Sequence, residues 1–346
     1  MSWLEREIHE QPAAIARLLD AARGTVERLA AAMRAHDVRY ILIAARGTSD
    51  NAGRYASYLF SAYNGLPVAM ATPSLYTLYR QPPRLRDVLV LGISQSGQSV
   101  DIIEVVQEAQ RQGALTAAIT NDPQSPLGEA AAFTLDLCAG EERAVAATKT
   151  YTASLVMLAL LSAVLAEDEE RLAALSRLPE RMARTLELTE DVARTRAERY
   201  RYMAYCITIG RGFNYATAFE IALKLKELTY IVAEPYSSAD FRHGPMAIIE
   251  PGFPVLVIAP DGALFGDLLA FLKELRERQA EVVVISNRME ALELADIAMP
   301  LPTALPEWLS PVAAVVPGQL LAYYLTLAKG LQPDAPRGLR KVTVTR

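Results

Sequence analysis

The chain of 346 residues contains the same sequence pattern twice. Arg46-Gly47 recurs as Arg211-Gly212, 165 positions later, and Ile119-Thr120-Asn121 recurs as Ile285-Ser286-Asn287 after 166 positions. A nearly constant offset over such a distance indicates an internal duplication. Because each copy is far longer than the roughly 20 to 50 residues of a solenoid repeat, we expect two similar domains rather than a stack of small repeats.

Each copy alternates short apolar runs with stretches of helical periodicity. The runs are rich in Val, Ile and Leu and end in turn-forming residues, which is typical of buried parallel strands. They cover residues 40–45, 88–93, 115–120 and 133–137 in the first copy and 204–209, 254–259, 281–285 and 297–301 in the second. Asn51–Tyr63 and Ser99–Gln112 have helical spacing of apolar residues. The sequence therefore predicts an α/β chain with two tandem doubly wound, flavodoxin-like parallel sheets.

The same alternation predicts the domain boundaries. We expect a helical lead over 1–37, a first domain over 38–165, a helical connector over 166–200, a second domain over 201–332 and a tail over 333–346. The uncharged stretch Ala153–Ala166 is shorter than the roughly 20 residues that cross a bilayer, so it predicts a buried helix and no membrane partner. The charged N-terminus lacks the pattern of a secretion signal, and we expect a cytoplasmic protein.

Charge and cysteine content exclude several classes of protein. The chain has 35 Lys and Arg against 40 Asp and Glu, a net charge of −5, and its basic residues are dispersed. Binding a nucleic-acid backbone needs concentrated positive charge, so we expect no nucleic-acid partner. Cys138 and Cys206 lack a C-x-x-C spacing, which excludes a disulfide framework and a cysteine-built zinc site.

Hydroxyl-bearing residues follow two predicted strands of the first copy. Thr48 and Ser49 come after the strand at 40–45, and the loop Ser94–Ser99 comes after the strand at 88–93. Ligands of open α/β sheets lie at the carboxyl ends of strands, where helix N-termini present N–H groups. A loop of hydroxyl, amide and glycine residues can therefore hold a phosphate there.

The same loop also suits an ordinary helix start. Ser99 would then be the N-cap, and Asp101 would interact favourably with the helix dipole. The two interpretations are compatible with each other. The corresponding loop of the second copy, Pro260-Asp261-Gly262, lacks the hydroxyl cluster, so we expect only the first copy to hold the anion.

The second copy supplies charged residues suited to proton transfer. Lys224 and Glu227 are three positions apart and share one face of a predicted helix. Such a pair is most often a solvated ion pair, but Ala216–Tyr230 is strongly apolar, which favours burial of one of the two residues. His243 lies in a turn-rich segment, where a lone histidine is more often incidental than catalytic.

One segment of the second copy allows a different interpretation. Gly210-Arg211-Gly212 follows a predicted strand and begins like the fingerprint of a dinucleotide-binding loop. Tyr215, however, stands where a third glycine or an alanine would let helix and strand pack closely. Nucleotide binding remains an alternative that this departure disfavours.

Six segments together resemble the sugar isomerase (SIS) family, in particular the isomerase half of glutamine-fructose-6-phosphate aminotransferase and its stand-alone relatives. The segments are Gly47-Thr48-Ser49, Ser94-Gln95-Ser96-Gly97, Ala147-Thr148-Lys149, Lys224-Leu225-Lys226-Glu227, His243-Gly244-Pro245 and Leu339-Arg340-Lys341. The resemblance extends over nearly the whole chain. It implies two tandem SIS domains that act on a phosphosugar.

The resemblance implies a set of substrate-binding residues. The phosphate of a hexose or hexosamine 6-phosphate would be bound by Ser49, Ser94, Gln95, Ser96 and Ser99. The sugar would be bound by Thr48, Val145 and Ala147.

It also implies four catalytic residues. Glu227 matches the base that moves a proton between C1 and C2, and Lys224 matches its active-site partner. His243 matches the ring-opening residue, which in this family comes from the neighbouring subunit, so a homodimer is expected. Lys341 matches the tail lysine that forms a Schiff base with a ketose. Proton transfer and imine chemistry of this kind require no metal and no cofactor.

Two departures from the family bear on the reaction. Ser2 follows Met1 and both cysteines are internal, so we expect no glutaminase nucleophile and no use of glutamine within this chain. Ala147 stands where the synthase usually has serine, and Gln98-Ser99 replaces its Glu-Thr, which puts the substrate in question more than the phosphate site.

The sequence thus predicts a deaminase that converts glucosamine 6-phosphate into fructose 6-phosphate and ammonia. Two alternatives stay open, a fructosamine-6-phosphate deglycase and a non-catalytic phosphosugar-binding regulator. Retention of Glu227, His243 and Lys341 together argues against the regulator, because a sensor needs none of this chemistry.

Overall fold

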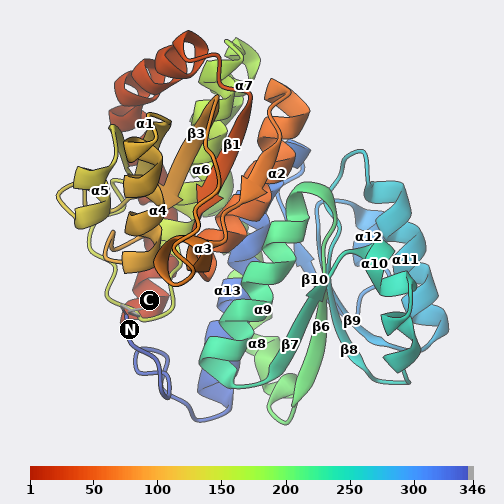
Figure 1. Ribbon diagram of the computed structural model, residues 1–346. Helices are drawn as coiled ribbons and strands as arrows, with labels where there is room; N and C mark the ends of the chain where they lie inside the picture. Colours follow the sequence, from red (N-terminus) through yellow and green to blue (C-terminus); the bar gives the residue numbers. More distant parts are fainter. Residues whose placement is uncertain (342–346) are drawn as a thin grey trace. The chain divides into compact units, whose positions relative to one another are not determined.

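The structure, a computed structural model, describes residues 1–341 and forms two compact α/β units (Figure 1). The unit that holds the first sheet, here the N-unit, comprises Ala13–Glu142 and Lys149–Arg177 together with Arg340 and Lys341. The unit that holds the second sheet, the C-unit, comprises Met1–Pro12, Arg143–Thr148 and Leu178–Leu339. Residues 342–346 of the expected C-terminal tail lie outside the described residues.

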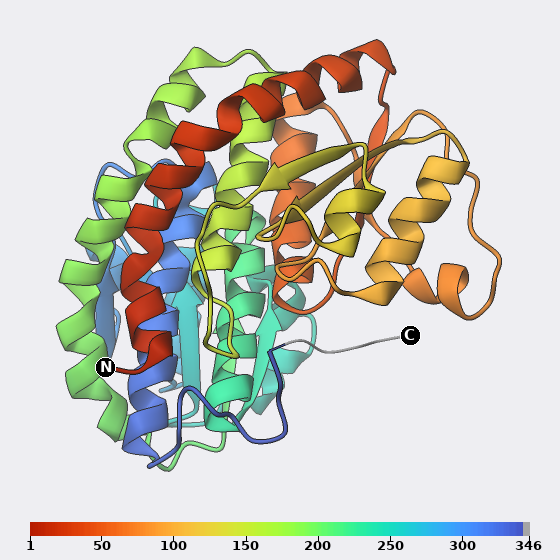
Figure 2. The ribbon, with the colours of Figure 1, turned by 90° about the vertical axis from the view of Figure 1, so that its left-hand side faces the viewer.

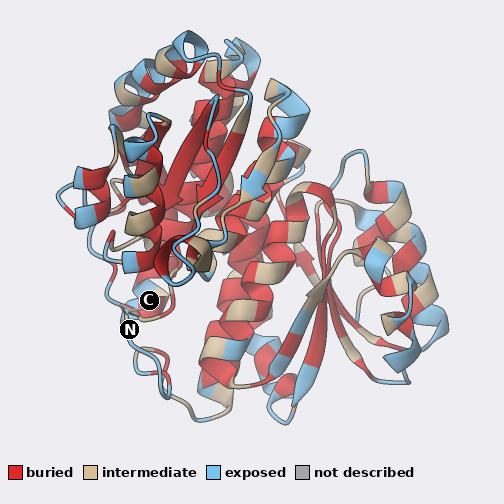
Figure 3. Ribbon diagram, viewed as in Figure 1, coloured by how far each residue is buried: buried red, intermediate tan, exposed pale blue. Residues whose placement is uncertain are grey.

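The N-unit is built around a five-stranded parallel sheet of order β2-β1-β3-β4-β5. Its strands are β1 (Tyr40–Ala44), β2 (Val68–Met70), β3 (Val88–Ile93), β4 (Leu115–Thr120) and β5 (Phe133–Asp136). Its helices, besides most of α1 (Trp3–Ala35), are α2 (Thr48–Asn64), α3 (Pro73–Thr77), α4 (Val100–Arg111), α5 (Pro126–Ala130), α6 (Lys149–Leu165) and α7 (Glu169–Ser176). Every residue of β3 and β4 is buried, as expected for central strands covered on both faces (Figure 3).

The C-unit repeats this topology in a sheet of order β10-β9-β8-β6-β7, also fully parallel. Its strands are β6 (Tyr205–Ile209), β7 (Val232–Tyr236), β8 (Pro254–Ile258), β9 (Glu281–Ser286) and β10 (Ile297–Pro300). Its helices are α8 (Leu178–Arg196), α9 (Tyr215–Thr229), α10 (Ser238–Arg242), α11 (Phe265–Glu277), α12 (Met289–Leu292) and α13 (Ser310–Ala328), with short 3-10 helices at Ala197–Tyr200, Gly212–Asn214, Pro245–Ile248 and Glu307–Leu309. The predicted duplication and doubly wound fold are confirmed.

The sequence analysis missed two strands, β2 and β7, which are both edge strands next to the first strand of their sheet. β2 has only three residues, none of them buried. β7 exposes Val232 and Glu234 and contains Pro235, a residue that sheets accept mainly at an edge. Neither segment therefore has the continuous apolar run by which the other eight strands were predicted.

Two long apolar helices form core elements. In α6 every residue from Lys149 to Val164 is buried, so the predicted buried helix is confirmed. The sequence analysis did not consider a longer uncharged run, residues 308–328. Among the described residues, the segment Glu307–Ala328, which contains α13, is long and apolar enough to cross a membrane, but 83% of its apolar window is buried within the structure. That degree of burial is typical of the core helix of a soluble protein.

The first helix continues through a proline. Figure 2 shows α1 as one continuous helix, in red, although Pro12 lies inside it. A proline supplies no N–H to the carbonyl four residues earlier. Here the side-chain Nε2 of Gln11 donates to that carbonyl, Ile8 O, at 2.9 Å. This replacement hydrogen bond satisfies the carbonyl group that Pro12 leaves without its helical partner.

Candidate active site

The phosphate-binding candidates lie at the switch point of the N-unit sheet. β1 and β3 are hydrogen-bonded neighbours, with Leu42 beside Val90, while the chain continues from β1 to β2 on one side and from β3 to β4 on the other. The crevice at such a point, outside the carboxyl ends of the strands, is where open α/β sheets bind ligands. Thr48 and Ser49 begin α2 directly after β1, and Ser94–Ser99 join β3 to α4.

Hydrogen bonds within the loop hold its serine hydroxyl groups together. The Gly97 N–H lies 3.2 Å from both the carbonyl oxygen and the Oγ of Ser94. Ser94 Oγ is 3.3 Å from Ser99 Oγ, and the Gln98 N–H donates to Ser96 Oγ at 3.3 Å. Ser99 is the N-cap residue of α4, as predicted, but its side chain makes no capping hydrogen bond. Its hydroxyl faces Ser94 instead.

Gly97 is required by the shape of this loop. Its φ of +63° lies in the left-handed region, which residues with a Cβ rarely adopt. A Cβ at this position would also lie 1.9 Å from Ser125 Oγ, which is far inside van der Waals contact. The backbone of the loop can therefore turn here only with glycine.

An ion pair connects the two hydroxyl-bearing loops. Arg46, which follows β1, lies with its Nε 2.8 Å from Oδ2 of Asp101, in the first turn of α4. The Asp101 side chain is 1% exposed and its Oδ1 accepts from the N–H of Ile102. Asp101 thus stabilises the helix start, as predicted, and in addition holds the β1–α2 loop against the β3–α4 loop.

Asn121, just after β4, connects a third segment to the same edge. Its N–H donates to Gln95 O at 3.1 Å, and its Nδ2 donates to Gly140 O at 2.8 Å. Its Oδ1 accepts from the Ala139 N–H at 3.0 Å. Asn121 therefore connects Ala139 and Gly140 by hydrogen bonds to Gln95 of the phosphate-loop candidate.

The tail lysine of the prediction belongs to the N-unit. Lys341 Nζ lies 2.8 Å from Oε2 of Glu142, whose side chain is fully buried, and the Lys341 side chain is 24% exposed. The sequence analysis assigned no role to Glu142. The N-unit thus contains the phosphate-binding candidates Ser49, Ser94, Gln95, Ser96 and Ser99, the sugar-binding candidate Thr48 and the tail residue Lys341.

The C-unit contains the acid and base candidates, on α9. Lys224 Nζ is 2.5 Å from Oε2 of Glu227 and 3.4 Å from Oε1 of Glu220. The Lys224 and Glu220 side chains are 1% and 0% exposed, whereas that of Glu227 is 24% exposed. The prediction that one member of the Lys224 and Glu227 pair is buried is confirmed, and Lys224 is that member.

The charge state of Lys224 follows from its two carboxylate neighbours. Burial alone would lower the pKa of this ammonium group, but the negative charges and hydrogen bonds of Glu227 and Glu220 outweigh burial and raise the pKa well above its ordinary value. Lys224 is therefore a stable ammonium ion. It can orient the Glu227 carboxylate, but it does not act as a nucleophile or base near neutral pH.

His243 lies in an exposed turn at the end of α10. The turn needs the glycine that follows, because Gly244 has a φ of +143°. Arg242 anchors the turn to α11 through Asp267 at 3.0 Å and Glu274 at 2.9 Å. The imidazole is thus presented at the surface of the C-unit on a well-anchored segment.

Val145 and Ala147, the remaining sugar-binding candidates, are half-buried in the segment Arg143–Thr148 of the C-unit. A residue that the sequence analysis missed holds the start of this segment. Glu7 of α1 is 2% exposed, and its carboxylate accepts the N–H groups of Arg143 and Ala144, the latter at 3.1 Å. The position of Val145 thus depends on a residue near the beginning of the chain.

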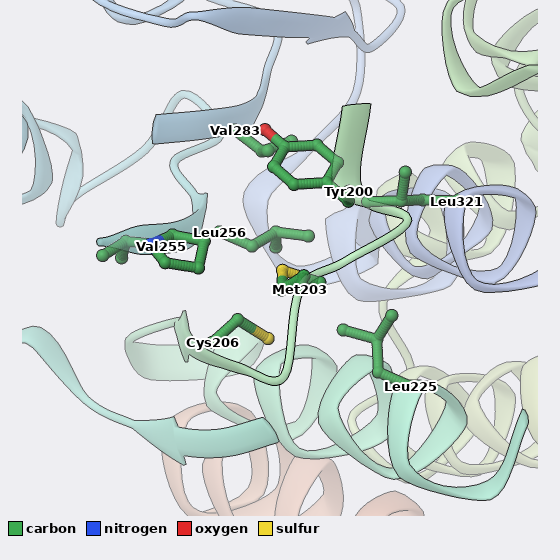
Figure 4. Close-up of a pocket in the computed structure, with 9 residues that line it drawn as sticks. Tyr200, Met203, Cys206, Leu225, Val255, Leu256, Val283 and Leu321 are labelled. Atoms are coloured by element: carbon green, nitrogen blue, oxygen red, sulfur yellow. The ribbon is translucent and has the colours of Figure 1, made fainter. Parts of the chain in front are cut away.

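Two pockets of the C-unit lie elsewhere, among residues at the amino ends of β6 and β8. One is an open pocket of about 390 Å³ lined by residues that include Tyr202, Tyr205 and Glu281. The other is an apolar cavity of about 20 Å³ (Figure 4), lined by Tyr200, Met203, Cys206, Leu225, Pro254, Val255, Leu256, Val283 and Leu321. Burial raises the pKa of the Cys206 thiol to about 12, so this group is not a reactive thiolate.

Within residues 1–341, no cluster of three or more His, Cys, Asp or Glu side chains is suited to hold a metal ion.

The glycines of the dinucleotide-like segment have local structural causes. A Cβ at Gly210 would lie 2.0 Å from Asn214 O, and a Cβ at Gly212 would lie 2.5 Å from a Leu264 methyl group. Asn214 itself is buried and its Nδ2 donates to Ser310 Oγ at 2.7 Å. Close packing within the C-unit therefore accounts for both glycines without a bound nucleotide.

The N-unit has a hydroxyl-lined loop at the switch point of its sheet, and the C-unit has a buried lysine in contact with a partly exposed glutamate. These features define the protein as a doubly wound α/β protein with a candidate anion site and candidate acid-base residues. The SIS domain family model matches residues 36–164 and 206–329, and the chain belongs to the SIS family.

Similar proteins carry related names. The glutamine–fructose-6-phosphate aminotransferase (isomerizing) of Aquifex aeolicus is 36% identical over 99% of this chain, which spans 57% of that protein's length. A crystal structure described as a phosphosugar isomerase from Silicibacter pomeroyi is 36% identical, with a TM-score of 0.87 over 96% of this chain and 100% of that one. The C-terminal domain of glucosamine-fructose-6-phosphate aminotransferase from Francisella tularensis is 29% identical, with a TM-score of 0.88 over 97% and 98% of the two chains.

Proposed function

We propose that this protein converts glucosamine 6-phosphate into fructose 6-phosphate and ammonia. The observation that carries the proposal is the α9 pair, in which the buried ammonium ion of Lys224 lies 2.5 Å from the Glu227 carboxylate. A carboxylate that is oriented and still 24% exposed is suited to move a proton between adjacent carbon atoms of a sugar. Membership of the SIS family and similarity to proteins named for fructose 6-phosphate support a phosphosugar as the substrate.

The substrate phosphate binds in the N-unit loop. Neutral hydroxyl and amide donors of Ser49, Ser94, Gln95, Ser96 and Ser99 surround it, and the N-termini of α2 and α4 add favourable dipoles. Thr48, Val145 and Ala147 contact the sugar. Because the donors are neutral, this binding needs no excess of basic residues and is compatible with the chain's net charge of −5.

The reaction then runs in three stages. His243 opens the ring and exposes the C1 aldehyde. Glu227 removes the proton from C2 and delivers it to C1, while one proton of the amino group passes to O1. The 2-amino aldose thereby becomes the C2 imine of fructose 6-phosphate without any change in overall composition. Lys341 displaces ammonia from C2 by forming its own imine with the ketose, and one water molecule hydrolyses that imine to fructose 6-phosphate and free Lys341.

The assay is direct. Purified full-length protein is incubated with glucosamine 6-phosphate, and ammonia and fructose 6-phosphate are quantified. We expect both in equal amounts. Turnover of a fructosamine 6-phosphate without turnover of glucosamine 6-phosphate would identify a deglycase instead. Tight binding of both compounds without turnover of either would identify a regulator.

Replacing the proposed base gives a sharper test. Glu227→Gln keeps the shape of the side chain and should abolish exchange of the C2 proton of glucosamine 6-phosphate with deuterium oxide. The affinity for fructose 6-phosphate should change less than about threefold. Glu234→Gln, at an exposed position of β7, is the control and should leave exchange unchanged. Persistent exchange in the Glu227 variant would remove this residue from the role of base.

We further propose a cytoplasmic homodimer in which each site receives His243 from the other subunit. Inactive Glu227→Gln and His243→Asn proteins, mixed and allowed to exchange subunits, would then regain up to about a quarter of wild-type activity. This fraction arises because half of the dimers are mixed and one of their two sites is intact. No recovery despite verified subunit exchange would place Glu227 and His243 of each site on the same subunit.

A further inference from the structure

Glu142 is a buried carboxylate to which the proposed reaction assigns no role. Its side chain is fully buried. Oε1 accepts the N–H of Thr150 at 3.1 Å, and Oε2 accepts the Thr150 hydroxyl at 2.8 Å, so the carboxylate caps the N-terminus of α6. Oε2 also lies 2.8 Å from Nζ of Lys341.

A buried carboxylate needs compensation for its lost hydration. The helix N-terminus supplies part of it through the N–H of Thr150 and the helix dipole. The ammonium group of Lys341 supplies a full opposite charge, although this residue is 199 positions away in the sequence. Removing one partner of a buried ion pair is costly, so contact with Glu142 restricts where the tail lysine can lie.

The contact places Lys341 in the phosphate-binding unit. The tail up to Leu339 belongs to the C-unit, whereas Arg340 and Lys341 belong to the N-unit, as does Glu142. The segment before Glu142 is held by Asn121, which bonds to both Gly140 O and Gln95 O. Asn121 thus connects the Ser94–Ser99 loop by hydrogen bonds to Gly140, two residues before the carboxylate that contacts Lys341.

We infer that Glu142 is a positioning residue that docks the ammonium group of Lys341 beside the phosphosugar site and thereby controls imine formation by the tail. The inference rests on the proposed function for the imine step, but not for the docking. Glu142 does not touch the substrate in this scheme. It acts through Lys341.

The same carboxylate can receive the proton that Lys341 must lose before it attacks. Transfer of one proton from Nζ to Glu142 leaves a neutral amine, whose lone pair forms a C–N bond with C2 of the ketose imine. The C2 imine nitrogen departs as ammonia with the two remaining amine protons, giving a neutral imine on Lys341 and a protonated Glu142. The net charge is zero before and after, and no other reactant is needed.

Chemical footprinting tests the docking without any sugar. The full-length protein is treated briefly with an amine-acetylating reagent, and modification of Lys341 is measured by mass spectrometry relative to exposed Lys273. We expect Glu142→Gln to increase the relative modification of Lys341 at least about tenfold, because the amide offers no negative charge. Glu141→Gln, which alters the adjacent exposed carboxylate, is the matched control and should match wild type. Equal modification in all three proteins would overturn the inference.

Borohydride trapping tests the imine. Fructose 6-phosphate and borohydride should give a hexitol phosphate adduct on Lys341 in the wild type and in Glu141→Gln. Its rate of formation should fall at least about tenfold in Glu142→Gln and recover in part in Glu142→Asp, which restores the charge. A Glu142→Gln protein that is trapped at the wild-type rate would refute the positioning role. If footprinting shows that Glu142 docks Lys341, but borohydride traps no adduct in any of the proteins, the covalent step of the proposed function would be refuted instead.

A second pair of variants covers the case in which Glu142→Gln fails to fold. Lys341→Met removes the cation, and Lys341→Arg keeps it. If the pair exists, Lys341→Met should have a lower melting temperature than Lys341→Arg, because it leaves the buried Glu142 with less compensation. Equal melting temperatures for the two variants would argue against the ion pair.

Discussion

The substitution Lys224→Met tests the charge arrangement on α9 most directly. It removes an ammonium group that is 1% exposed and lies within 3.4 Å of one carboxylate and 2.5 Å of another. The Glu220 carboxylate, whose side chain is fully buried, would then lose the ammonium group that lies 3.4 Å from its Oε1. Methionine fills a similar volume, so the loss is mainly electrostatic.

The expected magnitude follows from the burial of this pair. Breaking a buried ion pair by removing one partner costs about 3–5 kcal/mol. We expect Lys224→Met to lower the free energy of unfolding at pH 7 by that amount in urea titrations followed by circular dichroism. Lys226→Met is the matched control, because Lys226 is exposed on the same helix, and it should change stability by less than about 0.5 kcal/mol.

The pH dependence gives an independent check. The pKa of Lys224 is raised in the folded state above its ordinary value of 10.5. Its stabilising contribution is therefore fully present below pH 10.5 and is lost only as the pH rises through the raised folded-state pKa. The difference in free energy of unfolding between wild type and Lys224→Met should therefore be the same from pH 7 to about pH 10. A loss below about 1 kcal/mol at pH 7 would refute the buried charge arrangement.

Three further substitutions or treatments test other parts of the structure. Gly97→Ala should abolish binding of fructose 6-phosphate, measured by calorimetry. The control Gly113→Ala, with a similar φ but nothing within 4 Å of the added Cβ, should retain it. Equal binding by both variants would contradict the steric argument. Cys206 should resist thiol reagents in the folded protein from pH 7 to 9, since burial raises the pKa of its thiol to about 12; rapid labelling at pH 8 without unfolding would contradict this. Val283→Ile should fill the cavity of about 20 Å³ and stabilise the protein by up to about 1 kcal/mol. A melting temperature below that of the wild type would show that the cavity cannot accept a methylene group.

Much of the architecture follows from local sequence pattern. The eight strands with continuous apolar runs were predicted to within one residue at each end, because buried parallel strands leave an unbroken signal. The edge strands β2 and β7 leave no such signal, since partial exposure and Pro235 disrupt the pattern. The helix that contains Lys224 and Glu227 was apolar enough to indicate that one of the two is buried, but the pattern did not reveal that Glu220 completes the arrangement.

The positioning residues of the site could not be predicted in the same way. Asp101 pairs with Arg46, 55 positions away, and Glu7 binds the N–H groups of a segment more than 130 positions away. The place of Asp101 at a helix start was predicted, but its pairing with Arg46 was not, and Glu7 looks in the sequence like an ordinary surface residue of a helix. Nothing in the sequence around Glu142 indicates that it caps the helix at Thr150, eight positions later, or that it contacts Lys341.

By itself, the sequence determined the duplication, the two doubly wound sheets and the types of residue available for phosphate binding and proton transfer. These features depend on periodicity and on turn chemistry, which act between residues close together in the chain. Only the tertiary structure decided which charges are buried and what compensates them: Lys224 between two carboxylates, and Glu142 with Lys341. The physical reason is that the free energy of a buried charge depends on its nearest neighbours in space, and those neighbours can lie anywhere in the chain.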